Sequence, residues 1–200
     1  MTSMPRVARP VTVDEFLTLV PDGQKADLLD GVIHVASPDS PEAAEVYVFL
    51  IEILSPFVRR RGLGKIYGPR SAFRLSQFYA PEPDLAFVRK DRLHLWKKSY
   101  FQGAPDLAIE IISPDSVERD TVVKRRAFEE AGVQEYWMVD LLQGVCIFLR
   151  LEGDRYREAA LESDSIFRSG VLPGFWLDCR WLTAEELPDP GECLKSILGE

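Results

Sequence analysis

Residues 105–140 constrain the fold of this chain more than any other stretch. They read PDLAIEIISPDSVERDTVVKRRAFEEAGVQEYWMVD: an apolar run, a tight turn, a stretch with helical spacing and a second apolar run. The first run is apolar on both of its alternating faces, which is typical of a strand buried in the centre of a sheet. The segment therefore predicts a strand, a turn, a helix and a second strand.

Two charged side chains stand within this apolar pattern. Alternation places Glu110 on a strand face with apolar neighbours, so its carboxylate is expected inside the protein or at a cleft. A buried carboxylate needs a cation, a metal or hydrogen bonds to offset its lost hydration. On a helical wheel of residues 119–131, Lys124 lies inside the apolar arc, with Asp120 one turn before it. Of the local cations only Lys124 faces the sheet, so we expect it to meet Glu110.

The rest of the chain alternates helices and short strands. Thr12 and Glu15 have the spacing of a capping box before a helix at 13–20, and the Asp30-Gly31 pair favours a hairpin turn between two strands. Helical spacing predicts the longest helix at 39–58. Further strands are expected within 65–88, at 145–151, at 155–161 and near Trp176. Residues 89–103 look like a surface excursion, and the last twenty residues look peripheral.

Composition constrains the number of domains, the expected location and the way in which the chain could bind nucleic acid. Its 200 residues, 46% of them apolar, fit one domain (1–200) with a core at about 24–182. No long apolar run and no apolar leader occur, so we expect a soluble protein that is neither exported nor bound to a membrane. Three scattered cysteines suggest neither a zinc site nor a disulfide framework and favour a cytoplasmic location. The net charge of −8 disfavours passive capture of nucleic acid, so DNA binding needs local basic patches or a metal.

Asp84 supplies a second carboxylate, because it opens another strand that is apolar on both faces. Asp84, Glu110 and the backbone carbonyl of Ile111 form a set of oxygen ligands that suits Mg²⁺ or Mn²⁺, with Asp27 as a fourth candidate. Such a metal polarises a phosphoryl oxygen and lowers the pKa of a bound water, and Lys124 would orient that water or stabilise developing charge. The predicted chemistry is hydrolysis of a phosphodiester.

Structural readings of the same side chains remain open. A buried ion pair between Glu110 and Lys124, without catalysis, satisfies the same pattern. Asp27 could be an exposed residue at a strand edge, and Asp106 could cap a turn. The basic run at 59–61 could be a solvated helix end or a phosphate contact. Tyr136 and Trp137 are expected to pack in a half-buried strand. His34 and His94 stand isolated in the sequence, without the spacing of metal ligands.

Three blocks carry a family resemblance: PEPDLAFV, APDLAIEIISPDS and VVKRRAFEEAGVQEYWMVD. In these blocks, and from DGVIHVASP to VLPGFWLD, the chain resembles the Uma-two family of restriction-endonuclease-like proteins, a branch of the PD-(D/E)XK nuclease superfamily. The resemblance implies a restriction-endonuclease-like α/β core, in which helices flank a mixed β-sheet. It also implies a divalent metal held by acidic residues.

The resemblance assigns roles position by position. Asp84 matches the aspartate of the PD half of the motif, and Glu110 matches the acidic member of the second half. The lysine expected two residues later is Ile112 here, but family members resemble this chain in placing a lysine on the following helix, as Lys124 does. They usually carry glutamate where this chain has Asp27, and often a histidine near the start of the long helix, where this chain has alanine.

The sequence leaves several functions open. The first is a Mg²⁺-dependent DNA endonuclease with metal on Asp84 and Glu110 and with Lys124 assisting the attacking water. The alternative is a catalytically weak nuclease fold that acts as a homodimeric binding or regulatory module. Hydrolysis of a small phosphodiester would better suit an acidic surface. We expect DNA as the partner and a homodimer as the assembly.

Overall fold

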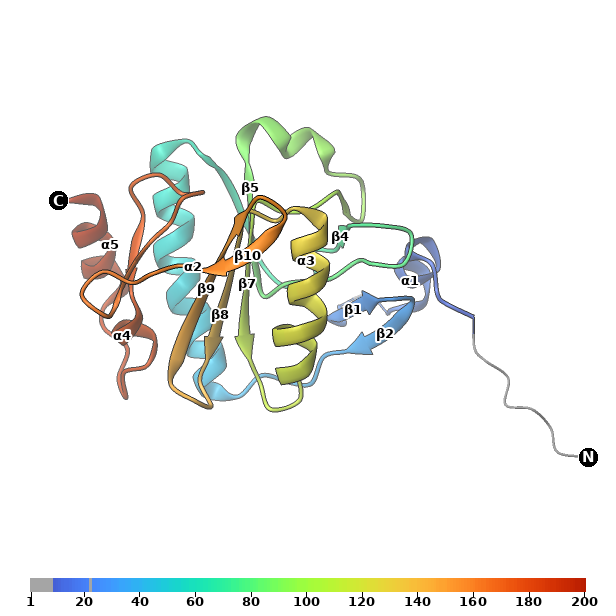
Figure 1. The fold of residues 1–200 in the computed structure, drawn as a ribbon, viewed down its shortest axis with the longest axis horizontal. Coiled ribbons are helices and arrows are strands. Elements are labelled where there is room, and N and C mark those ends of the chain that lie inside the picture. The colour runs from blue at the N-terminus through green and yellow to red at the C-terminus, as the bar shows by residue number, and fades with distance from the viewer. Residues whose placement is uncertain (1–8, 22) are drawn as a thin grey trace, which may run out of the picture.

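The centre of the structure is a six-stranded mixed β-sheet. The computed structural model describes residues 9–21 and 23–200. The strands stand in the order β10-β9-β8-β7-β5-β3, in which the central pair β7 and β8 is parallel and the other neighbours are antiparallel. With helices on both sides, the sheet confirms the predicted α/β class (Figure 1). The strands are β3 (Gly64–Tyr67), β5 (Leu85–Arg89), β7 (Leu107–Ile112), β8 (Glu135–Asp140), β9 (Val145–Glu152) and β10 (Arg155–Glu158).

The central strands are buried along their whole length. Successive residues of a strand point to opposite faces, so Ile109 and Ile111 join one hydrophobic core while Ala108 and Ile112 join the other. Glu110 shares the second face, as the alternation predicted. Ile112 is packed among apolar side chains on that face, as predicted.

One principal helix lies on each face of the sheet, behind and in front of it in Figure 1. Helix α2 (Pro41–Arg61) begins at the cap Ser40 and is the predicted longest helix. Helix α3 (Arg125–Ala131) covers the opposite face through Phe128, whose ring packs on Tyr136. A π-helical turn, η2 (Arg119–Lys124), precedes α3 and was not anticipated by the regular helical wheel. No helix in the described part of the chain is long and apolar enough to cross a bilayer.

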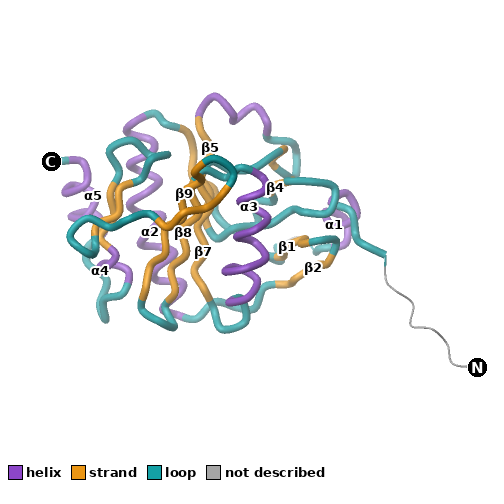
Figure 2. Tube along the Cα trace, in the orientation of Figure 1, coloured by secondary structure: helices purple, strands orange, loops and turns teal. Residues whose placement is uncertain are grey.

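The N-terminal elements form a separate layer beside the sheet (Figure 1, Figure 2). Helix α1 (Val13–Leu19) is capped by reciprocal bonds between Thr12 and Glu15, which confirms the capping box. Strands β1 (Ala26–Leu29) and β2 (Val32–Val35) form the predicted hairpin. Its turn residues Asp30 and Gly31 have φ of 50° and 72°, which is the region that such two-residue turns require. A β-carbon at Gly31 would lie 2.4 Å from the ring of Pro10, so only glycine fits.

Residues 89–103 lie largely at the surface, as predicted, but they contain regular structure. A 3₁₀ helix, η1 (Lys90–Leu95), leads to β6 (Phe101–Gln102), which pairs in parallel with β4 (Phe73–Arg74). The Phe73 ring lies 5.9 Å from that of Trp96 and 5.3 Å from that of Phe101, measured between centroids. These aromatic residues follow no regular period, so only their partners in the folded chain reveal the cluster.

The last twenty residues contribute buried side chains to the core, so the prediction that they are peripheral was wrong. After a small hairpin, β11 (Ile166–Arg168) and β12 (Trp176–Asp178), come α4 (Cys179–Leu182) and α5 (Pro190–Leu198). Leu194 and Ile197 of α5 are buried in the core cluster that α2 helps to form. Figure 1 shows α5 beside α2. Prolines and glutamates around these apolar positions concealed their spacing.

Candidate active site

Asp84 lies directly before β5 and faces the neighbouring strand β7. In the antiparallel register Leu85 pairs with Ile109, so one further step places Asp84 opposite Glu110. Opposed residues of an antiparallel pair have β-carbons about 5 Å apart on one face. The Asp84 Oδ2 atom accepts a hydrogen bond of 2.7 Å from the backbone N–H of Ile111. The two carboxylates that the sequence selected therefore lie side by side.

Lys124, the last residue of η2, reaches the same place from the helical layer that covers this face of the sheet. Its side chain is 1% exposed, and its ammonium donates a 2.8 Å hydrogen bond to Glu110 Oε1, so the predicted contact is present. Its Nζ also lies 3.0 Å from Asp27 Oδ2 and 3.4 Å from Asp120 Oδ1. Three carboxylates thus surround one buried lysine.

Asp27 is buried, which rules out its reading as an exposed strand-edge residue. Its Oδ1 accepts a 2.8 Å hydrogen bond from the backbone N–H of Glu82, and its Oδ2 contacts Lys124 and Arg119. Glu82 in return accepts a 3.1 Å bond from the N–H of Ala26. This reciprocal pair fixes β1 against the segment that leads into Asp84. Both oxygens of Asp27 are engaged, which favours a role in holding Lys124.

Burial changes the ionisation of this group of side chains. Burial raises the pKa of Glu110 well above its usual range, and the nearby Lys124 opposes this shift only in part. Burial also raises the pKa of Glu82 to about 7. Burial alone would lower the pKa of Lys124, but Asp27, Glu110 and Asp120 together raise it well above its usual value. The lysine is therefore charged at neutral pH.

Sequence reasoning missed two cations of the site. Lys25 forms an ion pair with Asp84 Oδ1 and keeps 22% of its side chain exposed. It stands two residues before Asp27, and this spacing on an extended chain was the available signal. Arg119 lies 3.5 Å from Asp27 and has a side chain only 19% exposed, so Lys124 is not the only cation turned inward. The π turn widens the helix at this point and moves Arg119 away from the position that a regular wheel gives it.

Other candidate residues have structural roles. Asp106 is buried and binds the backbone N–H of Arg89 at 2.9 Å and the side chain of Arg92 at 2.9 Å, as befits a residue that fixes a strand entrance. Tyr136 and Trp137 are fully buried in the core, so packing is confirmed while the expected half-buried strand is not. His94 lies in η1, apart from the site, whereas His34 stands opposite Asp27 in the β1–β2 register and so shares its face of the hairpin.

The donor chemistry of the site fits a divalent metal. Five carboxylates, those of Asp27, Glu82, Asp84, Glu110 and Asp120, face three cations, those of Lys25, Arg119 and Lys124. Among residues 9–21 and 23–200 no group of three or more His, Cys, Asp or Glu side chains is arranged to hold a metal ion. A site with two carboxylates suits Mg²⁺, which keeps several of its waters.

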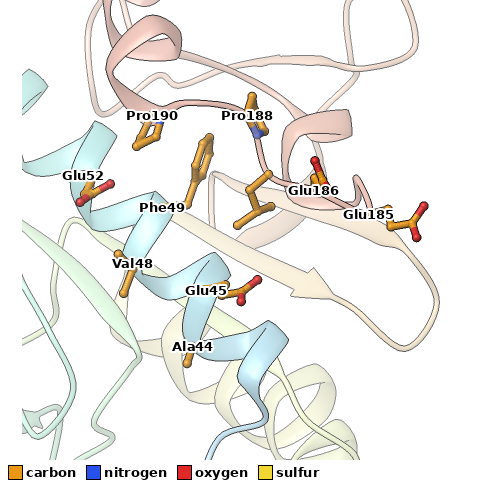
Figure 3. Close-up of a pocket in the computed structure, with 10 residues that line it drawn as sticks. Ala44, Glu45, Val48, Phe49, Glu52, Glu185, Glu186, Pro188 and Pro190 are labelled. Atoms are coloured by element: carbon orange, nitrogen blue, oxygen red, sulfur yellow. The ribbon is translucent and has the colours of Figure 1, made fainter.

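A hollow elsewhere on the molecule is less suited to a phosphate substrate than the Asp84–Glu110 site is. It has a volume of about 720 Å³ and lies between α2 and the segment before α5 (Figure 3). Val48, Phe49 and two prolines contribute apolar surface, and four glutamates line it as well: Glu45, Glu52, Glu185 and Glu186. Carboxylates repel a phosphodiester, so the catalytic interpretation stays with the Asp84–Glu110 site.

Comparisons with known proteins agree with this fold. A crystal structure described as a "putative nuclease belonging to DUF820", from Anabaena variabilis, superposes with a TM-score of 0.73 at 17% sequence identity, over 88% of this chain and 98% of that chain. At this identity the likeness concerns the fold. No curated protein matches the sequence. The Uma2 family, described as "Putative restriction endonuclease", matches residues 13–180. The chain therefore belongs to the Uma2 family.

Proposed function

We propose that this protein is a nuclease that hydrolyses phosphodiester bonds in DNA as a Mg²⁺-dependent endonuclease. The observation that carries the proposal is the register of β5 and β7, which sets Asp84 opposite Glu110 with Lys124 in contact. The printed description of the Uma2 family, "Putative restriction endonuclease", supports the same reaction class. Asp84, Glu110 and the Ile111 carbonyl are the proposed metal ligands, and Asp27 is a further candidate; the oxygens of both Asp84 and Asp27 already have protein partners that a metal would have to replace or share.

The side chains of the site divide into proposed metal ligands and residues that hold those ligands or Lys124 in place. Bound Mg²⁺ or Mn²⁺ would supply Lewis acidity toward a phosphoryl oxygen and toward water. Asp84 is oriented by the N–H of Ile111, which bonds one of its oxygens, while its other oxygen pairs with Lys25. Lys124, held by Asp27 and Asp120, keeps its charge where it can orient the attacking water or stabilise the developing negative charge.

Cleavage of supercoiled plasmid DNA tests the proposal. We expect wild-type protein to nick the plasmid with Mg²⁺ or Mn²⁺ and not in EDTA. Glu110→Gln and Asp84→Asn should each lower the rate by about 100-fold or more, because each removes a charged ligand. Glu152→Gln, a change at an exposed position of β9, is the matched control and should retain the wild-type rate.

Two results would contradict this assignment. Cleavage that persists in Glu110→Gln would show that another protein or another site is responsible. Wild-type protein that binds metal but cuts no DNA would favour the alternative of a binding or regulatory module. Faster hydrolysis of a nitrophenyl phosphodiester than of plasmid would instead indicate a small substrate. A homodimer and a cytoplasmic location stay predictions from the sequence.

A further inference from the structure

A second hollow, on the outer side of α3, gathers four arginines. It has a volume of about 670 Å³ and lies between α3 and β10. We call it the arginine hollow and define it by six charged residues that line it: Arg125, Arg126, Glu129, Glu130, Arg155 and Arg157.

Local structure fixes the direction of these side chains. In β10 the central Tyr156 is buried and donates its hydroxyl to the carbonyl oxygen of Val133 at 2.9 Å. Alternation then turns Arg155 and Arg157 to the same outer face, and both are exposed. The hollow is therefore formed by regular elements of the fold and not by a loop.

The charges of the arginine hollow are only half compensated. Glu130 pairs with Arg126 at 2.8 Å, and Glu129 pairs with Arg155 at 3.1 Å. Glu129 is also fixed by the backbone N–H of Tyr156, which lowers the pKa of its carboxyl together with Arg155. Within the described part of the chain, Arg125 and Arg157 have no carboxylate within ion-pair distance. The hollow thus carries two net positive charges in a chain whose net charge is −8.

The arginine hollow adjoins the candidate active site through one helical segment. Lys124, the last residue of η2, points into the site, and Arg125, the first residue of α3, lines the hollow. A helix with its side chains is about 10 Å across. Along duplex DNA one phosphate charge occurs about every 1.7 Å of axis. Phosphates a few positions from the scissile bond can therefore reach the far side of this helix.

We propose that the arginine hollow holds the sugar-phosphate backbone of duplex DNA while a phosphodiester bond is placed at the Asp84–Glu110 site. The inference rests on the proposed function and specifies where its substrate lies. Guanidinium groups bind phosphate oxygens through paired hydrogen bonds, and the unpaired Arg125 and Arg157 are free to do so without breaking an ion pair. The acidic hollow beside α2 offers no such surface.

Binding without cleavage tests this surface. Wild-type protein in EDTA is titrated into a fluorescent DNA duplex, and anisotropy is followed at several salt concentrations. The test variant is the double substitution Arg125→Gln and Arg157→Gln. The control removes the same charge from the segment after η1 by Lys97→Gln and Lys98→Gln, both at exposed positions. Circular dichroism and thermal melting establish that each variant is folded.

We expect the test variant to bind the duplex about tenfold more weakly at low salt. Its plot of log K against log salt concentration should be shallower by about 2, since each phosphate contact contributes about 0.9 to the slope. The control should stay within about twofold of wild type. Wild-type affinity in the test variant, an equal loss in the control, or absence of duplex binding by wild type would each overturn the inference.

Plasmid cleavage by the same variants separates this inference from the proposed function. If the duplex binds through the arginine hollow but wild type cuts nothing with Mg²⁺ or Mn²⁺, the nuclease assignment fails and the binding surface stands. If wild type cleaves and the test variant binds and cleaves equally well, the surface fails and the nuclease assignment stands.

Discussion

At the scale of single residues, the site is a balance between carboxylates and cations. Glu110 and Lys124 could be identified from the sequence because each breaks an apolar pattern. Lys25 breaks none, since it stands outside β1 and remains partly exposed. Its importance depends on Asp84, which lies 59 residues further along the chain. Pairs of this kind are visible only after folding.

Lys25 is expected to compete with the metal for Asp84. Replacing it by methionine keeps most of the side-chain volume and frees one carboxylate oxygen. We expect the affinity of Lys25→Met for Mn²⁺ to rise by about fivefold, the equivalent of about 1 kcal/mol for a partly exposed ion pair. Calorimetric titration measures this change. Unchanged or weaker Mn²⁺ binding would show that Lys25 does not occupy the metal site; Lys195→Met, exposed on α5, serves as the control.

Glu82 is expected to make stability depend on pH. Burial beside Asp27 raises its pKa to about 7, above the value in the unfolded chain. The unfolded state then releases its proton at lower pH, so this stabilisation is complete below about pH 4.5 and is lost as pH rises through about 7. We expect wild type to lose about 1–3 kcal/mol of unfolding free energy over this range. Glu82→Gln should show a smaller loss in urea denaturation, and an equal loss would contradict the assignment.

At the scale of elements, the π turn η2 decides which side chains reach the site. Its widened turn exposes Val122, 58% accessible, while it buries Asp120 and Lys124. Such turns are frequent at functional sites. A regular helical wheel predicted the direction of Lys124 correctly because Lys124 directly precedes the regular helix α3, whose packing on the sheet sets its orientation. The wheel failed for Arg119, on the other side of the irregularity.

At the scale of the whole molecule, the site joins three layers: β1 from the hairpin, β5 and β7 from the sheet, and η2 from the helical layer. Its excess of carboxylates predicts that a divalent metal stabilises the fold. At a Mg²⁺ concentration about 100 times Kd, binding to the native state adds about 2.7 kcal/mol to the unfolding free energy. Urea denaturation with and without Mg²⁺ measures this increment.

The increment should largely disappear in Asp84→Asn and persist in Glu152→Gln, since only the first removes a proposed ligand. An equal Mg²⁺ effect in both variants would place the metal elsewhere. The two variants differ from wild type by a similar carboxylate-to-amide change, so general screening of charge affects them alike.

The sequence by itself determined the elements whose signals are local. Strand alternation, the capping box and the Asp30-Gly31 turn act over a few residues, and these elements formed as predicted. The tertiary structure decided the partners: Lys25 with Asp84, Arg119 with Asp27, Trp96 with Phe73 and α5 with α2. Their physical basis is contact between segments distant in the chain, where burial and charge act across the fold and leave no period in the sequence.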